Sequence, residues 1–299
     1  MAALVLLRYG ELALKSPPVR REFERTLKRN VLDQFLSEKA SCRIRADHGH
    51  MYVEADDSEL ALRLLRRVFG VTSASLVHEV PTDRALITQA LLALAEPILP
   101  PGTTFAVRAR RTGTHPFTSQ ELARDLGGDV LDRWPDRALK VRLDDPAVEL
   151  HVEVRGPRTY LSLGRVQGPG GLPLGVAGRV VALVDGKRGA LGAYLMMKRG
   201  CRTSFVTTGP GLSLVERTLL KLDPHAGTTV APPGDDEPTA SLRAAADAGH
   251  ADGVVLPISV EGYAEAHGTF GDRVLFSPTV AFTDEEVERR WHEVEEVAS

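Results

Sequence analysis

One stretch in the first half of the chain constrains the fold most, because a strand pattern is followed there by a helix pattern with only a short turn between them. Phe105, Val107 and Ala109 alternate with Arg108 and Arg110. This period of two predicts a strand with an apolar face toward a core and both guanidinium groups on the opposite face.

The turn after this strand leads into a helix start. Thr118 and Glu121 have the three-residue spacing of a capping box, and apolar residues follow at helical spacing. A basic strand that runs into the positive end of a helix is suited to hold a phosphate. The alternative is a solvated strand edge before an ordinary capped helix, which is the commoner fate of a charge run.

Composition indicates a soluble globular chain with two or three domains. The 299 residues are 43% hydrophobic and 26% charged, and the net charge is −3. The first 165 residues hold 25 Lys+Arg against 22 Asp+Glu, a net +3, and the remainder holds 12 against 18, a net −6. Phosphate contacts are therefore expected in the front half.

Apolar runs in the sequence are too short to span a bilayer, and the N-terminus has no signal-peptide cleavage pattern. We expect a cytoplasmic protein without a membrane partner. The two cysteines, Cys42 and Cys201, exclude a disulfide framework and any site that needs three or four thiolates from one chain. Both are expected to be buried, inert thiols.

The first 80 residues predict the order strand, helix, strand, strand, helix, strand, which is that of a ferredoxin-like unit. The expected elements are Leu4–Leu7, a helix that starts at Ser16, Cys42–Ala46, Met51–Ala55, Ser58–Phe69 and Val71–Val80. Gly70 is the expected residue in left-handed conformation after the second helix.

A metal site has to be considered at Asp47, His48 and His50, because they lie within four residues. No further ligand cluster supports it, and a hairpin turn accounts for these residues. The sequence therefore predicts no metal site.

The rest of the chain predicts a second small α/β unit, a Gly/Pro linker and a doubly wound parallel sheet. The apolar run Arg179–Val184, a glycine turn and a helix over Ala190–Arg199 are typical of the start of such a sheet. The overall class is α/β with an α+β front half. The expected divisions are 1–80, 81–166, a linker at 167–177, and 178–299.

Two stretches of the front half resemble the tRNA 4-thiouridine synthetases, the sulfurtransferases also linked to thiamine synthesis. Residues 8–16, RYGELALKS, are similar to the opening of that family, and residues 108–127, with the core HPFTS, are similar to its THUMP domain. Residues 170–175 and 193–200 resemble the entry and first helix of its ATP-pyrophosphatase domain, an adenine-nucleotide hydrolase-like fold. The resemblance is specific up to about residue 200 and loose afterwards.

The resemblance implies that the two front domains bind tRNA, with the THUMP domain at the acceptor end. The residues expected to contact phosphates or base edges are Arg108, Arg110, Arg111, His115 and Ser119. A second expected patch consists of Lys15, Arg20 and Arg21. Tyr9 and Phe117 are candidates for stacking on bases, although burial is the commoner fate of such rings.

The chain departs from the family at the loop that binds ATP. Family members carry Ser-Gly-Gly-x-Asp-Ser there, and the corresponding residues are Val184, Asp185, Gly186, Lys187, Arg188 and Gly189. Only the second glycine remains, and Asp185 places a carboxylate where a phosphate should approach. Like charges at close range cost on the order of 1 to 4 kcal/mol, so the loop is expected to repel ATP. Lys187 and Arg188 are either compensating charge for another anion or part of a solvated turn.

These residues lead to the hypothesis of a tRNA-binding protein of this ancestry without ATP-dependent activity, a pseudoenzyme that uses no cofactor. Its expected partners are tRNA and a separate modifying enzyme or sulfur donor, and a homodimer is a further alternative. The rival hypothesis is an active tRNA sulfurtransferase that makes 4-thiouridine with ATP and Mg²⁺ through an altered loop.

Overall fold

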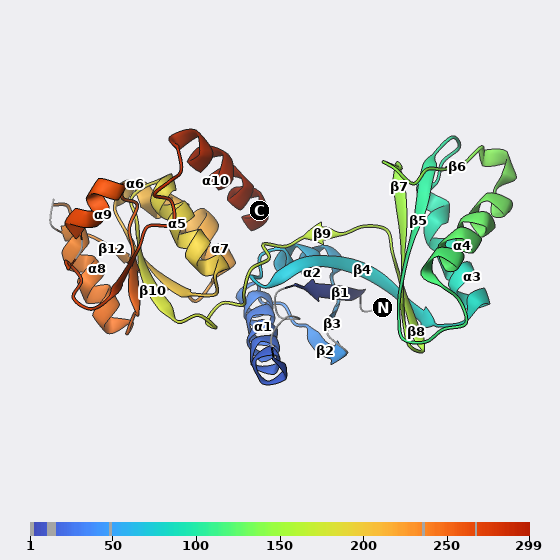
Figure 1. Cartoon of the computed structure of the whole chain (residues 1–299), viewed down its shortest axis with the longest axis horizontal. Helices are drawn as coiled ribbons and strands as arrows, with labels where there is room; N and C mark the ends of the chain where they lie inside the picture. Colours follow the sequence, from blue (N-terminus) through green and yellow to red (C-terminus); the bar gives the residue numbers. More distant parts are fainter. Residues whose placement is uncertain (1–2, 11–15, 48–49, 235–236, 267) are drawn as a thin grey trace.

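The computed structural model describes residues 3–10, 16–47, 50–234, 237–266 and 268–299. Figure 1 shows an elongated chain with three units along its long axis. A ferredoxin-like unit lies at the centre, and the C-terminal unit lies on one side of it. A second α/β unit lies on the other side; we call it the middle unit because it comes between these two in the sequence. None of the helices in the described residues is long and apolar enough to cross a membrane.

The ferredoxin-like unit has the element order that the sequence predicts. Its elements are β1 (Ala3–Tyr9), α1 (Pro17–Ser37), β2 (Arg43–Asp47), β3 (His50–Ala55), α2 (Ser58–Leu65) and β4 (Val71–Pro81). β1 lies between β3 and β4, antiparallel to both, and the apolar faces of α1 and α2 pack on this sheet.

The second helix of this unit is shorter than the sequence predicts. Asp57 caps its start by accepting from the backbone N–H groups of Glu59 and Leu60. The helix ends at Leu65 instead of Phe69, and the next residues form tight turns. Gly70 then takes φ +96°, a left-handed conformation that a glycine adopts without strain.

The middle unit is built from a sheet with helices on one face only. Its elements are α3 (Arg84–Ala95), a 3₁₀ turn (Glu96–Ile98), β5 (Thr104–Thr112), α4 (Ser119–Arg133), a 3₁₀ turn (Pro135–Arg137), β6 (Lys140–Val141), β7 (Val148–Arg155) and β8 (Arg158–Ser162). The next strand, β9 (Val166–Gln167), returns to the ferredoxin-like unit. The capping box of Thr118 and Glu121 is present at the start of α4. β6 is a short strand of two residues.

The two front units share one continuous sheet, because the long strand β4 belongs to both. β4 pairs with β1 over its first part and with β8 over its last part, from His78 to Pro81. The resulting strand order is β2-β3-β1-β4-β8-β7-β5-β6, and β9 also pairs with β4.

The C-terminal unit is a parallel sheet with helices on both faces, as predicted. Its elements are β10 (Arg179–Val184), α5 (Lys187–Lys198), β11 (Arg202–Thr207), α6 (Gly209–Leu214), a π-helical segment (Val215–Leu219), α7 (Leu220–Leu222), β12 (Thr228–Val230), α8 (Glu237–Ala248), β13 (Gly253–Val255), α9 (Val260–Ala266), β14 (Val274–Phe276) and α10 (Asp284–Ala298). The strand order is β12-β11-β10-β13-β14. α5 and α10 pack on one face of this sheet, and α8 packs on the other.

Helix α1 also docks the ferredoxin-like unit onto the C-terminal unit. The buried Asn30 amide donates to the carbonyl of Leu174 at 3.2 Å. The buried Gln34 amide donates to the carbonyls of Lys221 and Leu222, at the end of α7. Gln34 thus satisfies backbone acceptors that the end of α7 leaves unpaired, and Asn30 satisfies one in the linker, so the contact fixes how the two units meet.

Candidate nucleic-acid interface

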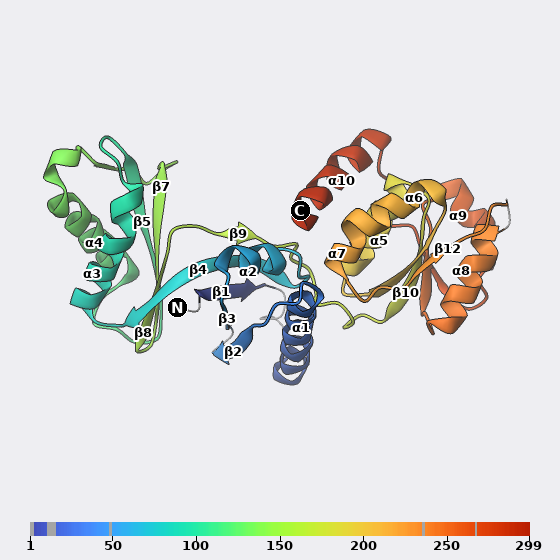
Figure 2. The same ribbon diagram turned by 180° about the vertical axis from the view of Figure 1, so that it is seen from behind.

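The open face of the middle sheet is turned toward the ferredoxin-like unit. Figures 1 and 2 show α3 and α4 on the outer side of this sheet and no helix on its inner side. Phe105 and Val107 of β5 belong to the core beneath the helices. Arg108 and Arg110 are in register with His151 and Glu153 of the neighbouring strand β7.

A cleft of about 730 Å³ lies along β5 and the start of α4. Its polar lining comprises Arg108, Arg110, Ser119, Glu149, His151 and Arg165. The Arg108 guanidinium donates through Nε to Glu149 Oε1 at 2.8 Å and through Nη2 to the carbonyl of Leu143 at 2.5 Å. The hydrogen bond from Arg108 holds the pKa of Glu149 below its ordinary value.

A second cleft, of about 440 Å³, adjoins the first. It is lined by Arg8, His50, Arg110, Arg111, Ser119, Glu153 and Arg155, among others. Arg110 and Ser119 line both clefts. Among the described residues Arg110 has no hydrogen bond or ion pair, so its guanidinium is available to a phosphate that bridges the clefts.

The buried carboxylate of Glu153 organises the arginines around these clefts. Glu153 is 4% exposed and accepts from Arg8 Nε and from Arg155 Nη2, each at 2.9 Å, while Arg165 Nη2 lies at 3.7 Å. Burial alone raises the pKa of Glu153, but Arg8 and Arg155 outweigh burial and keep it below its ordinary value.

Positive charge exceeds negative charge in the cluster of side chains around Glu153. Burial, and then repulsion by Arg8, lowers the pKa of Arg165. Burial, and then repulsion by Arg165, lowers the pKa of His151. The buried Nε atoms of Arg155 and Arg165 have no hydrogen-bond partner. A face with surplus guanidinium groups and unused donors is suited to an anion.

Four of the predicted contact residues line these clefts, and His115 and Phe117 lie on the turn beside them. Arg108, Arg110 and Ser119 line the larger cleft. His115 and Phe117 stack on each other, with ring centroids 5.6 Å apart and planes 20° apart, and both are partly buried.

Arg111 also lines the smaller cleft and donates to the Gly113 carbonyl at 2.9 Å.

The second predicted patch lies apart from these clefts, on α1. Arg20 is partly buried beside Glu24, and Arg21 is exposed. Lys15 falls outside the described residues. Tyr9 is 8% exposed and donates to Glu24 at 2.7 Å, which, together with burial, raises its pKa. Of its two expected fates, stacking on a base and burial, the structure shows burial.

Sequence reasoning missed Arg8, Glu153, Arg155 and Arg165 as parts of this face. The available signal was the period of two in β7, whose odd-numbered residues Glu149–Arg155 are polar and alternate with a buried Leu150, Val152 and Val154. Of the expected hairpin residues, His50 contacts the guanidinium of Arg155, and His48 falls outside the described residues. No group of three or more metal-ligating side chains occurs in the part of the chain that the structure describes.

The two cations at the start of α5, Lys187 and Arg188, both make structural contacts. Lys187 Nζ lies 2.5 Å from Glu288 on α10. Arg188 donates to the carbonyls of Thr279 and Phe282 at 2.8 and 2.9 Å, and to Asp284 at 2.8 Å. These contacts hold the acidic helix α10 against the start of α5.

At two neighbouring positions, Asp185 and Gly189, the chain differs from a phosphate-binding loop. The residue as a whole is exposed, but surrounding protein atoms desolvate the Asp185 carboxyl and raise its pKa. A Cβ atom at Gly189 would lie 2.4 Å from the carbonyl oxygen of Leu183, so the backbone has no room for a serine there. Gly186 has no atom within 4 Å of a Cβ position.

Cys201 is buried, as expected, and its thiol lies 3.4 Å from the carbonyl of Ala177. Burial raises its pKa. Cys42 is partly buried, and burial raises its pKa to about 11. Both thiols are therefore protonated at neutral pH.

Two family models match the front units. Residues 4–75 match the ThiI ferredoxin-like domain, and residues 82–164 match the THUMP domain. A probable tRNA sulfurtransferase of Methanothermobacter thermautotrophicus is 39% identical over 205 residues, which are 67% of this chain and 51% of that protein. A tRNA sulfurtransferase of Pyrobaculum aerophilum is 34% identical over 224 residues, which are 73% of this chain and 44% of that protein. The chain thus spans about half the length of the curated relatives it matches.

Two solved structures share the fold of nearly the whole chain. A crystal structure of a protein from Pyrococcus horikoshii has a TM-score of 0.81 and 25% identity, covering 97% of this chain and 99% of that chain. A 4-thiouridine synthetase solved with RNA and bound ATP has a TM-score of 0.77 and 20% identity, covering 100% of this chain and 86% of that chain. The arrangement of all three units is therefore one that known structures share.

Proposed function

We propose that this chain binds tRNA and acts in the formation of 4-thiouridine. It belongs to the tRNA sulfurtransferase family through its ferredoxin-like and THUMP domains. The observation that carries tRNA binding is the pair of adjoining clefts on the open face of the THUMP sheet, with Arg110 at their junction. Guanidinium groups make bidentate bonds to phosphate, and about half to two-thirds of the hydrogen bonds between proteins and DNA go to phosphate and sugar.

The charges on this face support a polyanion as the ligand. Arg8, Arg155 and Arg165 surround the one buried carboxylate of Glu153, so the cluster has a net positive charge. Arg110 adds a further charge on the same side. A small anion needs one such cation, whereas a face of this extent matches successive phosphates of an RNA strand.

Of the two functions considered from the sequence, the comparisons favour the active ATP-dependent tRNA sulfurtransferase. The relatives that share 31–39% of their residues with this chain are named as tRNA sulfurtransferases or probable ones. We therefore propose that function first. In it, the front units hold the acceptor end of tRNA, and the C-terminal unit supports ATP-dependent activation of a uridine.

A specific observation favours the second function, tRNA binding without ATP chemistry. Lys187 and Arg188 are committed to α10, and no hydroxyl side chain stands in the loop from Asp185 to Gly189. In this reading the chain presents tRNA to a separate enzyme or sulfur donor. A homodimer is compatible with either function.

Titration with tRNA tests the shared part of the proposal. The parent chain should bind an unmodified tRNA transcript, and its affinity should fall steeply as salt concentration rises. The Arg108→Ala/Arg110→Ala variant should bind more weakly and with a smaller salt slope. Equal affinity and equal slope for parent and variant would place the RNA elsewhere.

Titration with ATP separates the two functions. Calorimetry of the full chain with ATP and Mg²⁺, followed by an assay for 4-thiouridine with tRNA and a persulfide donor, measures binding and product. Saturable ATP binding with 4-thiouridine formed supports the sulfurtransferase. Tight tRNA binding with no ATP binding supports the second function.

A further inference from the structure

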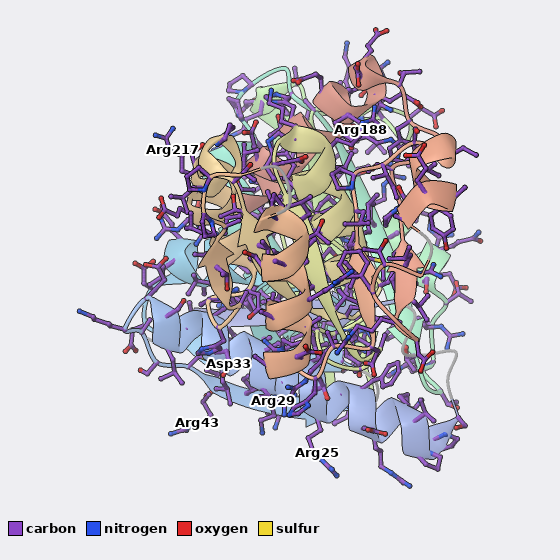
Figure 3. All side chains as sticks on the ribbon, turned by 90° about the vertical axis from the view of Figure 1, so that its left-hand side faces the viewer. Arg25, Arg29, Asp33, Arg43, Arg188 and Arg217 are labelled. Atoms are coloured by element: carbon purple, nitrogen blue, oxygen red, sulfur yellow. The ribbon has the colours of Figure 1, made fainter. Side chains whose placement is uncertain are left out.

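A stripe of basic residues runs along the outward face of α1, away from the clefts of the THUMP domain. Its members are Arg21, Arg25, Lys28 and Arg29, all exposed; Arg25 follows Arg21 by four residues, and Lys28 and Arg29 follow Arg25 by three and four. Within the described residues none of the four has a carboxylate partner. Figure 3 shows Arg25 and Arg29 projecting from the same side of this helix. The stripe is about 12 Å long, at 1.5 Å per residue.

The stripe ends at a cleft of about 470 Å³ between the ferredoxin-like and C-terminal units. α1 contributes Arg29 and Asp33 to this cleft, β10 contributes Arg179, and β11 contributes Arg202. The cleft lies at the amino ends of the parallel strands. The loop of Asp185 and Gly186 lies at their carboxyl ends, so the two places are distinct.

Two of the arginines in this cleft have no acidic partner. Arg202 is already paired with the buried Asp223, at 2.8 Å. Arg179 donates from its side chain only to the carbonyl of Gly249, at 3.5 Å, and Arg29 has no hydrogen bond among the described residues.

The other charged side chains at this cleft are Arg202, which pairs with Asp223, and Asp33, which lies beside His225. Asp33 Oδ1 lies 3.7 Å from His225 Nε2. Because Asp223 balances Arg202, the two charges of Arg29 and Arg179 face the single carboxylate of Asp33, and the cleft keeps a surplus of positive charge.

We infer that the stripe and this cleft together form a second contact surface for the sugar–phosphate backbone of tRNA. The inference rests on the proposed function and adds a place on the protein where the same RNA is held. Among the described residues the cleft lining contains no Phe, Tyr or Trp ring, and its one imidazole, that of His225, lies 3.7 Å from Asp33, whereas a phosphate has two guanidinium groups there. The contact should therefore add affinity without sequence preference.

The shape of the chain makes this contact independent of the THUMP contact. Figure 1 shows the THUMP domain and the C-terminal unit at opposite ends of the molecule, with α1 beside the C-terminal unit. An RNA as long as tRNA reaches both surfaces, and charges this far apart along a chain act additively.

The test compares two double variants of the full chain that remove the same charge. Arg29→Ala/Arg179→Ala removes the two unpaired cations of the cleft. Arg43→Ala/Arg217→Ala removes two exposed arginines that lie outside the cleft and the stripe. Affinity for a tRNA transcript is measured over a series of salt concentrations.

The cleft variant should bind about tenfold or more weakly, with the magnitude of the salt slope reduced by about 1 to 2, and the control should match the parent. Arg29→Lys/Arg179→Lys should keep most of the slope, because a phosphate contact needs charge more than fork geometry. Equal binding by the two alanine variants would overturn the inference.

The failure of the inference can be told apart from that of the proposed function. If Arg108→Ala/Arg110→Ala weakens binding and the cleft variant does not, tRNA binding stands and the second surface is wrong. If the parent shows no salt-dependent tRNA binding, the proposed function fails and the inference fails with it. Thermal unfolding of each variant verifies that these exposed side chains leave the fold intact.

Discussion

Arg8 of the first strand and Glu153 of β7 are 145 positions apart in sequence, and Arg8 Nε lies 2.9 Å from Glu153 Oε1. The same carboxylate accepts from Arg155 Nη2 at 2.9 Å. One buried carboxylate therefore joins the ferredoxin-like unit to the open face of the THUMP sheet. Its partners are the arginines that line the smaller cleft, so the contact that holds the two units also shapes the candidate RNA surface.

Glu153→Gln should lower the free energy of unfolding by about 3 kcal/mol, because it removes the buried negative charge that the partly buried Arg8 and Arg155 share. Glu149→Gln is the matched control, because Glu149 pairs with Arg108 at a site where both side chains are 38% exposed. There the loss should stay below about 1 kcal/mol. Urea unfolding of both variants measures the difference, and similar losses would show that the buried contact has no special weight.

The contribution of Glu153 should disappear in acid. Its pKa is lower in the folded chain than in the unfolded one, so its stabilising effect is complete above the unfolded value of about 4.3 and is lost as pH falls through the folded value. The gap in unfolding free energy between the parent and Glu153→Gln should therefore be full at neutral pH and shrink below about pH 4.3. A gap that stays constant down to pH 3 would contradict the assignment.

Arg110→Ala and Arg108→Ala should separate binding from stability. Arg110 has no partner among the described residues, so its loss should weaken tRNA binding with a salt slope reduced by about 1, while the melting temperature stays unchanged. Arg108 already bonds Glu149 and the Leu143 carbonyl, so its loss should also remove part of the stability, on the order of 1 kcal/mol. Binding isotherms and thermal unfolding of the two single variants test whether both lose affinity and only the Arg108 variant loses stability.

The parts of the fold that local sequence controls were predicted well. The alternation in β5 and the capping box of Thr118 and Glu121 depend on neighbours within a few residues, and both are present. The role of Glu153 was out of reach, because it depends on Arg8, which only the folded sheet brings near. The end of α2 was missed because tight turns after Leu65 replace helical bonds that apolar periodicity alone would continue.

In the candidate site too, local sequence predicts some features, and contacts between distant segments determine the others. Arg108 and Arg110 were found because they alternate with core residues along one strand. The contacts of Arg188 with Thr279 and Phe282 join segments more than 90 residues apart, and no local pattern predicts them. Whether the altered loop excludes ATP stays a prediction.

Restoring the hydroxyl of the family at position 189 should destabilise the chain. In Gly189→Ser the new Cβ would lie 2.4 Å from the Leu183 carbonyl oxygen, so the backbone of β10 or α5 must shift. Overpacking of this kind costs typically 1 to 3 kcal/mol. Gly186→Ser is the control, because nothing lies within 4 Å of its Cβ and its φ of −178° suits any residue. Equal unfolding midpoints for the two variants would show that the loop adapts freely.

Neither thiol of this chain should react readily at neutral pH. With a pKa raised to about 11, Cys42 has about one thiolate per thousand molecules at pH 8, and burial raises the pKa of Cys201 as well. Iodoacetamide should therefore label the folded chain slowly at both positions and label both rapidly in concentrated urea, with Cys42→Ser isolating the signal of Cys201. Rapid labelling of the folded chain would contradict this. A cysteine takes sulfur from a persulfide donor by attacking its outer sulfur as a thiolate, while the donor's thiolate leaves. Slow labelling would therefore mean that the sulfur for 4-thiouridine comes from a donor other than these two cysteines.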